Sequence, residues 1–567
     1  MRTPYLWLLT GLVAISCGDD STSTPAPAND GGNADASTPE ASDDASADAG
    51  ADAVNADAPD VVEEPDAELS VCDQLGLPSR PFVSAQDDPS LSATAADLTL
   101  PTTDGDWTLS ENWTGCETYL FIQDQPRQAT GWSIDLWERD VDTLFDRAPK
   151  NTHFFFLSTA TNSAAVTASL DALRAEVDAA LLPRPKSQRD WWWDHVHYVT
   201  TPAKQLDGWL GAVMADPAWG VGIDRSQRIR YIGSYADPQR YDDFQQWFAP
   251  NLSMAANEAI YYNFEAEREG GLADTDTVLP LFSEVLASEN PTIDVDLPDA
   301  ASMAAFDTLE LDVFLGCGGA GEYGECPAWD RIVSLYLCDE ADPSICETEI
   351  GRWITTYHRE GRWVHDVSPL MPLIADGGTR RFRFTAQDPW QVTASIRLSN
   401  EGKTLRATHA WPLFTSGSNE GFDEGYNDLF DAITVTVPAS AQRVEIASMI
   451  TGHGMSMPGN CAEFCNTTHE FLVNGDVFTR NFPKAGSAFG CMDQVAEGTV
   501  PNQYGTWWYG RSGWCPGKEV PLATLDVTAS IIAGDNTIDL QAWFNGQPYT
   551  GDNWRFIDHA SWLVAYE

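Results

Sequence analysis

The alternation of apolar and polar positions divides the chain into two parts of different character. From about Cys72 to Gly270, short apolar runs alternate with amphipathic segments, a pattern typical of α/β folds. Glu117 to Gln123 and Thr152 to Ser158 predict strands, and the second run is unbroken, like a central parallel strand. A following helix is predicted by apolar residues that share one helical face and by the proline that ends it: Val166, Leu170, Leu173, Val177, Leu181 and Pro183.

A late hairpin completes this first part. Ser133 to Phe145 is predicted as a helix, Val196 to Val199 and Gly220 to Ile223 as strands, and Ile223 to Tyr231 as a hairpin. This order resembles the thioredoxin-like redoxins, in which a reactive cysteine follows the first central strand. The corresponding loop, Asp124 to Gln128, contains no cysteine. We therefore expect 72–270 to be a thioredoxin-like domain without thiol exchange, with a structural or substrate-presenting role.

The second part, from about Thr277, is dominated by strand-like alternation. The clearest runs are Leu309 to Val313, Ile433 to Val437, Val444 to Ile446, Thr537 to Leu540 and Ser561 to Val564. Gly, Asn, Asp and Pro separate these runs, and helical patterns are nearly absent. We predict two antiparallel β-sandwiches, at 277–425 and 426–567.

The N-terminus is predicted to be a processing signal. Arg2 precedes an apolar stretch, Leu6 to Ile15, that is too short to span a bilayer. The stretch ends in Ala14-Ile15-Ser16-Cys17, which resembles a bacterial lipobox, so 1–17 is predicted to be a lipoprotein signal peptide with Cys17 lipidated. Alanine stands where that pattern prefers leucine, so cleavage by an ordinary signal peptidase is the alternative.

Residues 18–71 are rich in Asp, Ala, Ser, Pro and Thr and are predicted to form a disordered acidic linker. We expect this linker to hold an exported protein at the cell envelope, on the outer membrane or cell surface; an acidic ligand-binding tail is the alternative. The net charge of −53 argues against a nucleic-acid partner, because a phosphate backbone attracts Lys and Arg.

Ten of the 11 cysteines remain for pairing if Cys17 carries lipid (11 − 1 = 10). In an exported protein, close spacing indicates disulfides. The predicted pairs are Cys317 with Cys326, Cys338 with Cys346, Cys461 with Cys465 and Cys491 with Cys515, which leaves Cys72 with Cys116. None of these pairs has the His and Cys spacing of a zinc finger, so neither a metal nor a cofactor is expected.

Three clusters in the second part each set a charged side chain beside a predicted disulfide. They are Cys326-Pro327-Ala328-Trp329-Asp330-Arg331, Asn460-Cys461-Ala462-Glu463-Phe464-Cys465 and Gly510-Arg511-Ser512-Gly513-Trp514-Cys515-Pro516-Gly517. A disulfide restricts the backbone, so a charged group beside it loses little further entropy when it meets a ligand. Each cluster alone is as readily an ordinary surface ion pair or a solvated arginine, but the three together indicate a functional site.

Together the clusters resemble the peptide-N-glycosidase F family. That family carries a Trp-Asp-Arg run after a disulfide, a Cys-Ala-Glu-aromatic-Cys loop and a Gly-Trp-Cys-Pro-Gly run. The match extends from about Thr277 to the end and includes Gly351-Arg352-Trp353-Ile354-Thr355. The resemblance implies two adjacent jelly rolls with the active site in the cleft between them. It also implies an amidase that cleaves between asparagine and the first GlcNAc of N-linked glycans, converting Asn to Asp.

The resemblance implies roles for particular residues. Asp330 corresponds to the principal catalytic carboxylate, and Glu463 is expected across the cleft, where it positions water or the sugar. A carboxylate whose pKa is shifted by a second carboxylate and an arginine can do acid and base work at one site. Arg331 and Arg511 are expected to hold the substrate. Trp329 and Trp514 are expected to shape the floor of the substrate site.

The sequence departs from the family pattern at two places. Thr385 to Trp390 stands where the family has a Thr-Glu-Thr-Trp run, so Asp388 or Gln387 is the candidate to replace that glutamate. Thr451 to Met455 replaces a Ser-Gly-Trp-Gly-His run, which puts His453 among the expected substrate contacts. Both changes fall where core sugars are recognised, so they bear on glycan preference.

Two other functions compete with the amidase. A copper monooxygenase of paired jelly rolls could use His453, Met455, Met457 and His469 as ligands, although this half has no His-x-His pair. A non-catalytic glycan-binding surface lipoprotein is the second. We expect a monomer whose substrates are N-glycosylated proteins or glycopeptides. Its lipid anchor is expected to attach it to a membrane.

Overall fold

The computed structural model describes residues 69–124, 136–138, 140–214, 220–233, 235, 251–272, 277–318, 326–551 and 554–567. Met1–Ala67 and Glu68–Glu567 form separate units, and the described residues belong to the second. The predicted signal peptide, Cys17 and nearly all of the acidic linker lie outside the described residues, as do 125–128 of the loop that follows the first central strand. Within the described ranges, no helix has the length and apolar character needed to cross a membrane.

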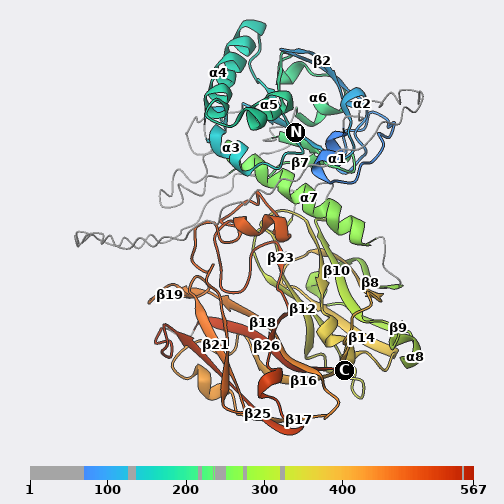
Figure 1. Ribbon diagram of the computed structural model, residues 1–567, viewed down its shortest axis with the longest axis vertical. Coiled ribbons are helices and arrows are strands. Elements are labelled where there is room, and N and C mark those ends of the chain that lie inside the picture. The colour runs from blue at the N-terminus through green and yellow to red at the C-terminus, as the bar shows by residue number, and fades with distance from the viewer. Residues whose placement is uncertain are drawn as a thin grey trace, which may run out of the picture. The chain divides into compact units, whose positions relative to one another are not determined.

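A seven-stranded sheet with surrounding helices forms the N-terminal part of the second unit (Figure 1). Its strand order is β2-β1-β5-β4-β3-β6-β7, with β3, β4 and β5 parallel and the other neighbours antiparallel. The strands are β1 (Thr99–Thr102), β2 (Gly105–Thr108), β3 (Thr118–Gln123), β4 (Thr152–Leu157), β5 (Val196–Val199), β6 (Gly220–Ile223) and β7 (Ile229–Tyr231). Every residue of β3 and β4 is buried, which explains their nearly unbroken apolar character.

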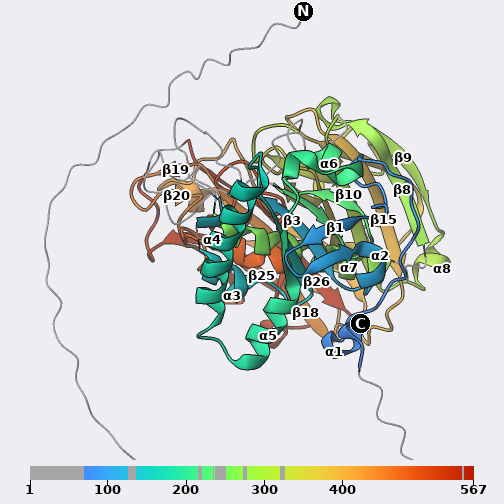
Figure 2. The same ribbon diagram turned by 90° about the horizontal axis from the view of Figure 1, so that it is seen from above.

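Alternate side chains of the central strands enter two different cores. Figure 2 shows from above the helices α4 and α6, which contribute to these cores. Leu120 and Phe154 belong to a core that includes the apolar face of α4, whereas Phe121 and Phe155 pack in a core with Trp209 of α6. The helices are α1 (Val71–Leu75), α2 (Leu109–Asn112), α3 (Val141–Arg147), α4 (Ser163–Leu181), α5 (Lys186–His195), α6 (Gly208–Met214), α7 (Ala255–Leu272) and α8 (Ala300–Met303).

Most predicted elements of this part are present. The helix expected over Ser133 to Phe145 is instead a short 3-10 turn (Leu136–Glu138) followed by α3, with Asp140 between them at φ 53°. Helices α5 and α7 were not predicted, because each mixes aromatic with charged residues rather than showing a clean apolar face. The thioredoxin-like assignment of 72–270 stays a prediction.

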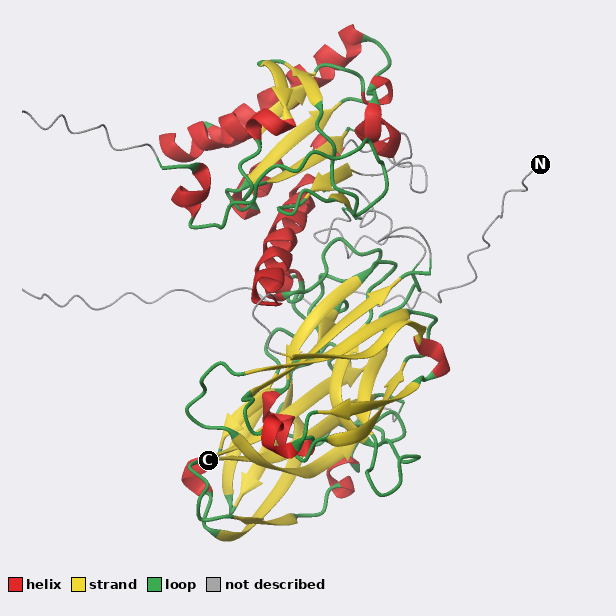
Figure 3. Ribbon diagram, turned by 90° about the vertical axis from the view of Figure 1, so that its right-hand side faces the viewer, coloured by secondary structure: helices red, strands yellow, loops and turns green. Residues whose placement is uncertain are grey.

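Two antiparallel sheets enclose the core of the first sandwich. Figure 3 shows in yellow the strands of this sandwich and of a second one that follows it in the chain. The strand orders of the two sheets are β13-β10-β15-β8 and β23-β12-β11-β14-β9. The strands are β8 (Thr277–Leu286), β9 (Thr292–Leu297), β10 (Thr308–Gly316), β11 (Ile332–Leu337), β12 (Thr348–Ile354), β13 (Gly361–Asp366), β14 (Gly378–Thr385), β15 (Gln391–Ser399) and β23 (Lys518–Glu519). Leu311 of β10 and Leu335 of β11 are fully buried in that shared core.

The second sandwich has its own core between sheets ordered β16-β26-β18-β24 and β17-β25-β21-β22. Its strands are β16 (Ala407–Ser416), β17 (Ile433–Val437), β18 (Arg443–His453), β21 (Thr467–Val473), β22 (Asp476–Asn481), β24 (Ala523–Asp526), β25 (Gly534–Phe544) and β26 (Phe556–Tyr566), and a small ribbon joins β19 (Met455–Ser456) to β20 (Cys461–Ala462). The unit is therefore mostly β with several antiparallel sheets. The jelly-roll winding of the sandwiches stays a prediction.

The two sandwiches exchange strands across the predicted boundary at 425. Strand β16 precedes that boundary but pairs with β26 of the second sandwich. Strand β23 follows it but pairs with β12 of the first. The second pair of sheets thus begins at Ala407, because backbone pairing, which the apolar pattern does not reveal, decides which sheet receives an edge strand.

The five predicted disulfides are all formed, joining Cys72 to Cys116, Cys317 to Cys326, Cys338 to Cys346, Cys461 to Cys465 and Cys491 to Cys515. A buried arginine adds a polar link between the sandwiches. Arg352 of β12 donates to Glu349 (2.9 Å from Nε to Oε1) and to the Asp558 side chain (2.5 Å) on β26. It also donates to the Thr451 hydroxyl (3.0 Å) on β18.

Candidate active site

The segment 510–517 runs along the junction of the sandwiches. The Gly452 N–H donates to the Ser512 carbonyl (2.9 Å), and the Ser512 N–H donates to the Glu463 carbonyl (2.7 Å). These bonds attach the segment to the second sandwich. Strand β23, directly after it, is an edge strand of the first sandwich. The third sequence cluster is therefore held from both sides.

A glycine is required within this segment. Gly513 has φ +85°, and a Cβ atom there would lie 2.0 Å from the Ile450 carbonyl oxygen. Any other residue would be strained in this conformation and would clash with the backbone. The close approach packs this segment directly against β18.

Arg511 connects the two carboxylates of the other clusters. Its side chain is 1% exposed. Nη2 lies 3.4 Å from Asp330 Oδ2, and Nε lies 3.3 Å from Glu463 Oε1. Nη1 donates to the carbonyl oxygens of Thr506 (3.2 Å) and Tyr509 (2.7 Å). Asp330 and Glu463, far apart in sequence, thus meet at one guanidinium.

Aromatic rings enclose the same guanidinium. Its carbon lies 5.4 Å from the Phe464 ring centre and 4.9 Å from that of Trp514, within range of cation–π attraction. Burial by itself lowers the pKa of Arg511, but the nearby Tyr357, Asp330 and Glu463 outweigh it and raise that pKa. The site therefore contains a permanent, rigidly held positive charge.

Asp330 stands two residues before the start of β11, and its side chain is 16% exposed. Its Oδ2 accepts a hydrogen bond of 2.5 Å from the Tyr357 hydroxyl. Burial raises the pKa of Asp330, while Arg511 and the Tyr357 hydrogen bond act in the opposite direction. Its chain segment is fixed by Thr355, whose hydroxyl accepts from the Arg331 N–H (2.7 Å) and donates to the Trp329 carbonyl (2.6 Å).

Glu463 lies in the tight loop closed by the Cys461–Cys465 disulfide. Its N–H donates to the Gly454 carbonyl (2.9 Å), and the Gly454 N–H donates to its Oε2 (3.2 Å). The side chain is 18% exposed. Burial raises the pKa of Glu463, Arg511 lowers it, and Asp330 raises it further. Each carboxylate thus makes ionisation of the other less favourable.

Tyr357 is a member of the site that the sequence did not indicate. Its backbone N–H donates to Gln503 Oε1 (2.8 Å), and Arg511 Nη2 donates to its hydroxyl (3.2 Å). A Cβ added at Gly505 would lie 2.8 Å from the Tyr357 ring, so only glycine leaves room for it. A tyrosine in a connection between strands has no distinguishing sequence signal, and only the fold brings its hydroxyl to Asp330.

The structure gives Arg511 a different position from the one expected of a substrate-holding arginine. Its N–H groups face Glu463, Thr506, Tyr509, Asp330 and Tyr357, all groups of the protein. A guanidinium has five N–H donors, and here they are committed. In this arrangement Arg511 holds the two carboxylates, and its expected contact with substrate stays a prediction.

The other expected substrate contacts divide into exposed and buried groups. Trp329 is 58% exposed, and Arg331 is exposed beside it. Trp514 is buried, and its indole N–H donates to the Gly452 carbonyl (2.7 Å), so it supports Arg511 from within. A cavity of about 280 Å³ is lined by Arg511 and Trp514 but by neither carboxylate.

The residues at the two departures from the family pattern are placed differently. Gln387 is exposed and Asp388 is partly buried in the connection between β14 and β15. Neither residue forms a hydrogen bond or an ion pair with Asp330 or Glu463. His453 ends β18, stacks on Trp514 at 5.0 Å, and bonds through Nε2 to the Thr451 hydroxyl (2.9 Å). Burial lowers the pKa of His453 to about 3, so its ring is neutral at neutral pH.

Two further exposed aromatic residues flank the site. Tyr504 packs edge-on against His358, next to Tyr357 in the chain. Trp554 packs against Gly454, the glycine bonded to Glu463, where an added Cβ would lie 2.8 Å from its ring. Both lie in irregular segments, and no motif in the sequence pointed to them.

The histidines of the copper alternative do not converge. His469 is buried in β21 with Nε2 on the Thr467 hydroxyl (3.1 Å), and His453 is stacked on aromatic rings. Met455 and Met457 are exposed. Across the described ranges, neither histidine belongs to a group of three potential His, Cys, Asp or Glu ligands. Among the described residues, His453, Met455, Met457 and His469 therefore form no common metal site.

The paired sandwiches, with a buried arginine between two partly exposed carboxylates, identify a β-sandwich protein with a polar site at the junction of its sandwiches. Residues 425–564 match the family model described as peptide-N-glycosidase F, C terminal. The chain is 25% identical over 246 residues to peptide-N(4)-(N-acetyl-beta-D-glucosaminyl)asparagine amidase F of Elizabethkingia miricola. The matched region covers 39% of this chain and 65% of that protein. The C-terminal part of the chain is therefore similar to the peptide-N-glycosidase F family, and the chain spans 65% of the length of this relative.

Solved structures give weaker likenesses. Recombinant peptide:N-glycanase F is 19% identical with a TM-score of 0.42, over 51% of this chain and 95% of that one. PNGase F, a glycosylasparaginase from Flavobacterium meningosepticum, is 18% identical with a TM-score of 0.41, over the same shares. PNGF-II is 13% identical with a TM-score of 0.39, over 59% of this chain and 71% of that one.

Proposed function

We propose that this protein is an amidase that hydrolyses the bond between an asparagine side chain and the first GlcNAc of an N-linked glycan. The observation that carries this proposal is the contact of Asp330 and Glu463 with one buried arginine, Arg511. Two carboxylates that disfavour each other's ionisation can hold one proton between them, which acid–base catalysis of amide hydrolysis requires.

The proposed reaction uses Asp330 as the base. Its carboxylate takes a proton from water, and the water oxygen bonds to the asparagine side-chain carbonyl carbon. The carbon–nitrogen bond then breaks, and the proton held by Asp330 passes to the nitrogen of the leaving glycosylamine. Asparagine becomes aspartate, and the glycosylamine later loses ammonia in water. Glu463 orients the water, while Arg511 and Tyr357 hold Asp330 in place.

Substrate contact is proposed for the exposed side chains around the carboxylates. Trp329, Tyr504 and Trp554 offer apolar ring faces on which sugar rings can lie. Arg331, exposed beside Asp330, can stabilise the oxyanion or bind glycan and peptide oxygens.

The remaining expected residues are assigned to glycan preference rather than to chemistry. His453 stacks on Trp514 and presents a neutral ring near Glu463, and Asp388 and Gln387 occupy a connection of the first sandwich. The proposed substrates are N-glycosylated proteins or glycopeptides. Export, lipidation at Cys17, a place at the cell envelope and a monomeric state belong to the same proposal.

The test is incubation of the protein with a denatured N-glycosylated protein in water enriched in ¹⁸O. Mass spectrometry should detect free glycan, and aspartate carrying ¹⁸O at former glycosylation sites. Asp330→Asn should abolish release while leaving glycopeptide binding largely intact, because the amide keeps the shape and loses the base. Asp376→Asn, which makes the same change at an exposed aspartate of the first sandwich, is the matched control and should retain release.

Three results would contradict the proposal. Release of glycan with the asparagine left intact would indicate cleavage within the sugar instead. Binding of glycopeptide without release, equal in wild type and Asp330→Asn, would favour the non-catalytic glycan-binding alternative. Copper measured in the purified protein in proportion to activity would favour the monooxygenase.

A further inference from the structure

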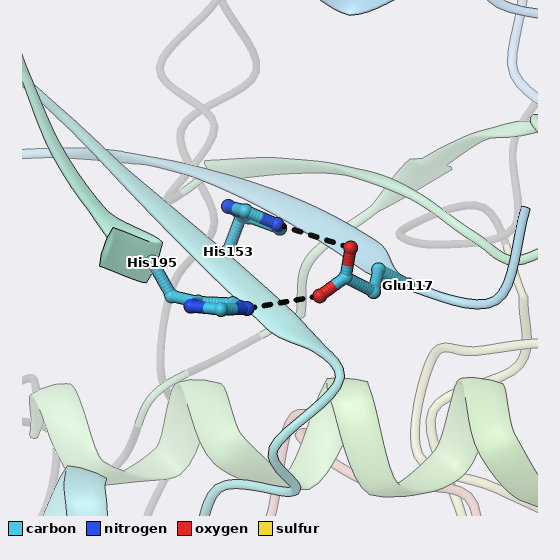
Figure 4. Close-up of side chains that lie close together, drawn as sticks. All are labelled: Glu117, His153 and His195. Atoms are coloured by element: carbon cyan, nitrogen blue, oxygen red, sulfur yellow. Dashed lines mark hydrogen bonds and ion pairs between the residues drawn. The ribbon is translucent and has the colours of Figure 1, made fainter. Parts of the chain in front are cut away.

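A second polar cluster lies in the N-terminal part of the unit, apart from the proposed amidase site. Glu117 directly precedes β3, His153 lies on β4 and His195 ends α5. All three are buried. Figure 4 shows the Glu117 carboxylate between the two imidazoles, with one oxygen facing each ring. The neighbouring strands bring together three residues that are far apart in sequence.

The contacts of His195 cannot be satisfied by a neutral imidazole. Nδ1 lies 2.7 Å from the Trp191 carbonyl oxygen, and Nε2 lies 2.9 Å from Glu117 Oε1. Both partners are acceptors only, whereas a neutral imidazole has one N–H donor. Nε2 must therefore carry a second proton or share a cation with Glu117.

We propose that Glu117, His153 and His195 bind one divalent transition-metal ion of the zinc class. Two imidazole nitrogens and a carboxylate form a donor set that such ions prefer. One potential ligand atom from each residue lies within 4.8 Å of the others. Ligand atoms bind zinc at about 2.0–2.2 Å, so the ion draws the side chains together by small rotations.

Groups around the cluster are arranged as supports for metal ligands. A metal-bound histidine commonly donates its other N–H to a carbonyl or another acceptor, which fixes its tautomer. The His195 Nδ1 contact with Trp191 has this form, and His153 Nδ1 lies 2.9 Å from His197 Nε2. With both Nδ1 atoms so engaged, each Nε2 is directed toward Glu117 and free to bind the ion.

The carboxylate is equally well fixed. The Thr114 hydroxyl donates to Glu117 Oε2 (2.9 Å). Cys116, next to Glu117, is bonded to Cys72, and its carbonyl accepts from the Asn151 side chain (2.8 Å). Because the ligands are preformed on strands and buried, the ion is assigned a structural role in holding β3, β4 and α5 together.

No metal was expected at this cluster from the sequence, where only cysteine-centred spacings and the His and Met residues of the second sandwich were considered. The competing explanation is a doubly protonated His195 in a buried ion pair with Glu117, which also satisfies both contacts. The two explanations differ in a measurable way. A metal site takes up one ion and loses it to chelators, whereas the ion pair takes up none.

The test uses the full chain, treated with a chelator, dialysed and titrated with ZnCl₂ by calorimetry. Excess Mg²⁺ occupies weak carboxylate sites of this strongly acidic protein. We expect about one tightly bound Zn²⁺ per chain and a higher melting temperature on binding. Co²⁺ in place of Zn²⁺ should give visible absorption bands typical of low-coordinate nitrogen and oxygen ligation.

The variants Glu117→Gln and His195→Asn should weaken Zn²⁺ binding by at least about 10-fold. His409→Asn, which alters an exposed histidine of the second sandwich, is the matched control and should bind as wild type does. Absence of saturable Zn²⁺ binding and of Co²⁺ bands in wild type would overturn the inference, even if the variants fail to fold. Equal binding by wild type and both variants would overturn it as well.

Discussion

Arg359 and Glu258 form a fully buried ion pair that joins α7 to the connection carrying Tyr357. Arg359 Nη1 lies 2.8 Å from Glu258 Oε1, and both side chains are almost completely excluded from solvent. The Asn502 amide donates to the same oxygen (2.9 Å). The helix of the N-terminal part thus helps to fix the loop whose tyrosine holds Asp330.

Removing the acidic partner of this pair should be strongly destabilising. Glu258→Ala leaves the Arg359 charge buried without its carboxylate, which costs about 3–5 kcal/mol in comparable buried pairs. Denaturant titration should show this decrease in the free energy of unfolding. Asp190→Ala, which breaks the exposed Lys186–Asp190 pair, is the control and should change it by less than about 0.5 kcal/mol. Equal effects of the two variants would mean that the buried pair contributes no more than an exposed one.

The second prediction concerns the bridging role of Arg511. Arg511→Lys keeps the charge but cannot reach Asp330, Glu463 and the two carbonyl oxygens together. Misplaced carboxylates should lower kcat of the proposed amidase by about 100-fold. KM should change little, because Arg511 does not face solvent.

Steady-state kinetics with a defined glycopeptide would measure both constants. Arg381→Lys, on an exposed ion pair of β14, provides the same chemical change away from the site and should leave both constants unaltered. A raised KM with unchanged kcat for Arg511→Lys would show instead that this arginine contacts the substrate.

The predicted parts of the fold are those with strong local patterns. Strands β3 and β4 and helix α4 could be predicted because burial imposes a recognisable apolar pattern on their sequences. The placement of β16 and β23 was not readable, since an edge strand can pair with either neighbouring sheet. Close cysteine spacing sufficed for four of the disulfides because a short loop limits the partners within reach, and Cys72 and Cys116 then remained to pair with each other.

The sequence indicated three residues of the candidate site, but it did not indicate Tyr357 or the groups that each side chain contacts. Asp330, Glu463 and Arg511 stand beside disulfides, which marked them in the sequence. The backbone carbonyls that occupy Arg511 leave no trace in residue identity, so its burial was unforeseen. Tyr357 and the Glu117 cluster are assembled only by the fold.

The third prediction tests the hydrogen bond between Tyr357 and Asp330. This bond lowers the pKa of Asp330, which burial otherwise raises. Tyr357→Phe removes it, so the pKa of Asp330 rises. The base form then appears only at higher pH, and the acidic limb of the proposed activity should move to higher pH. Profiles of kcat/KM against pH would measure the shift.

Tyr198→Phe, in β5 of the N-terminal part, is the matched control and should leave the pH profile in place. An acidic limb that moves to lower pH in Tyr357→Phe would contradict the assignment of Asp330 as the base. An unmoved limb with reduced kcat would indicate that Tyr357 only supports the packing.

The fourth prediction concerns stability and a carboxylate on β23. Burial raises the pKa of Glu519 from 4.5 to about 7, with Lys518 acting in the opposite direction. Between pH 4.5 and about 7, Glu519 is therefore mostly protonated in the folded protein and mostly ionised in the unfolded chain. Stability from this group is fully present below the unfolded pKa of 4.5 and is lost as pH rises through about 7.

Glu519→Gln removes the ionisation while keeping the shape of the side chain. At about pH 8 the variant should be more stable than wild type by up to about 3 kcal/mol, and near pH 4 the two should differ little. Denaturant titrations across this range would measure the difference, and Glu111→Gln, at an exposed glutamate, should follow the wild-type curve. A difference in stability that does not change with pH would contradict this explanation. It would mean that the amide stabilises the pairing of β23 with β12 through a new contact, and not by removing a buried charge.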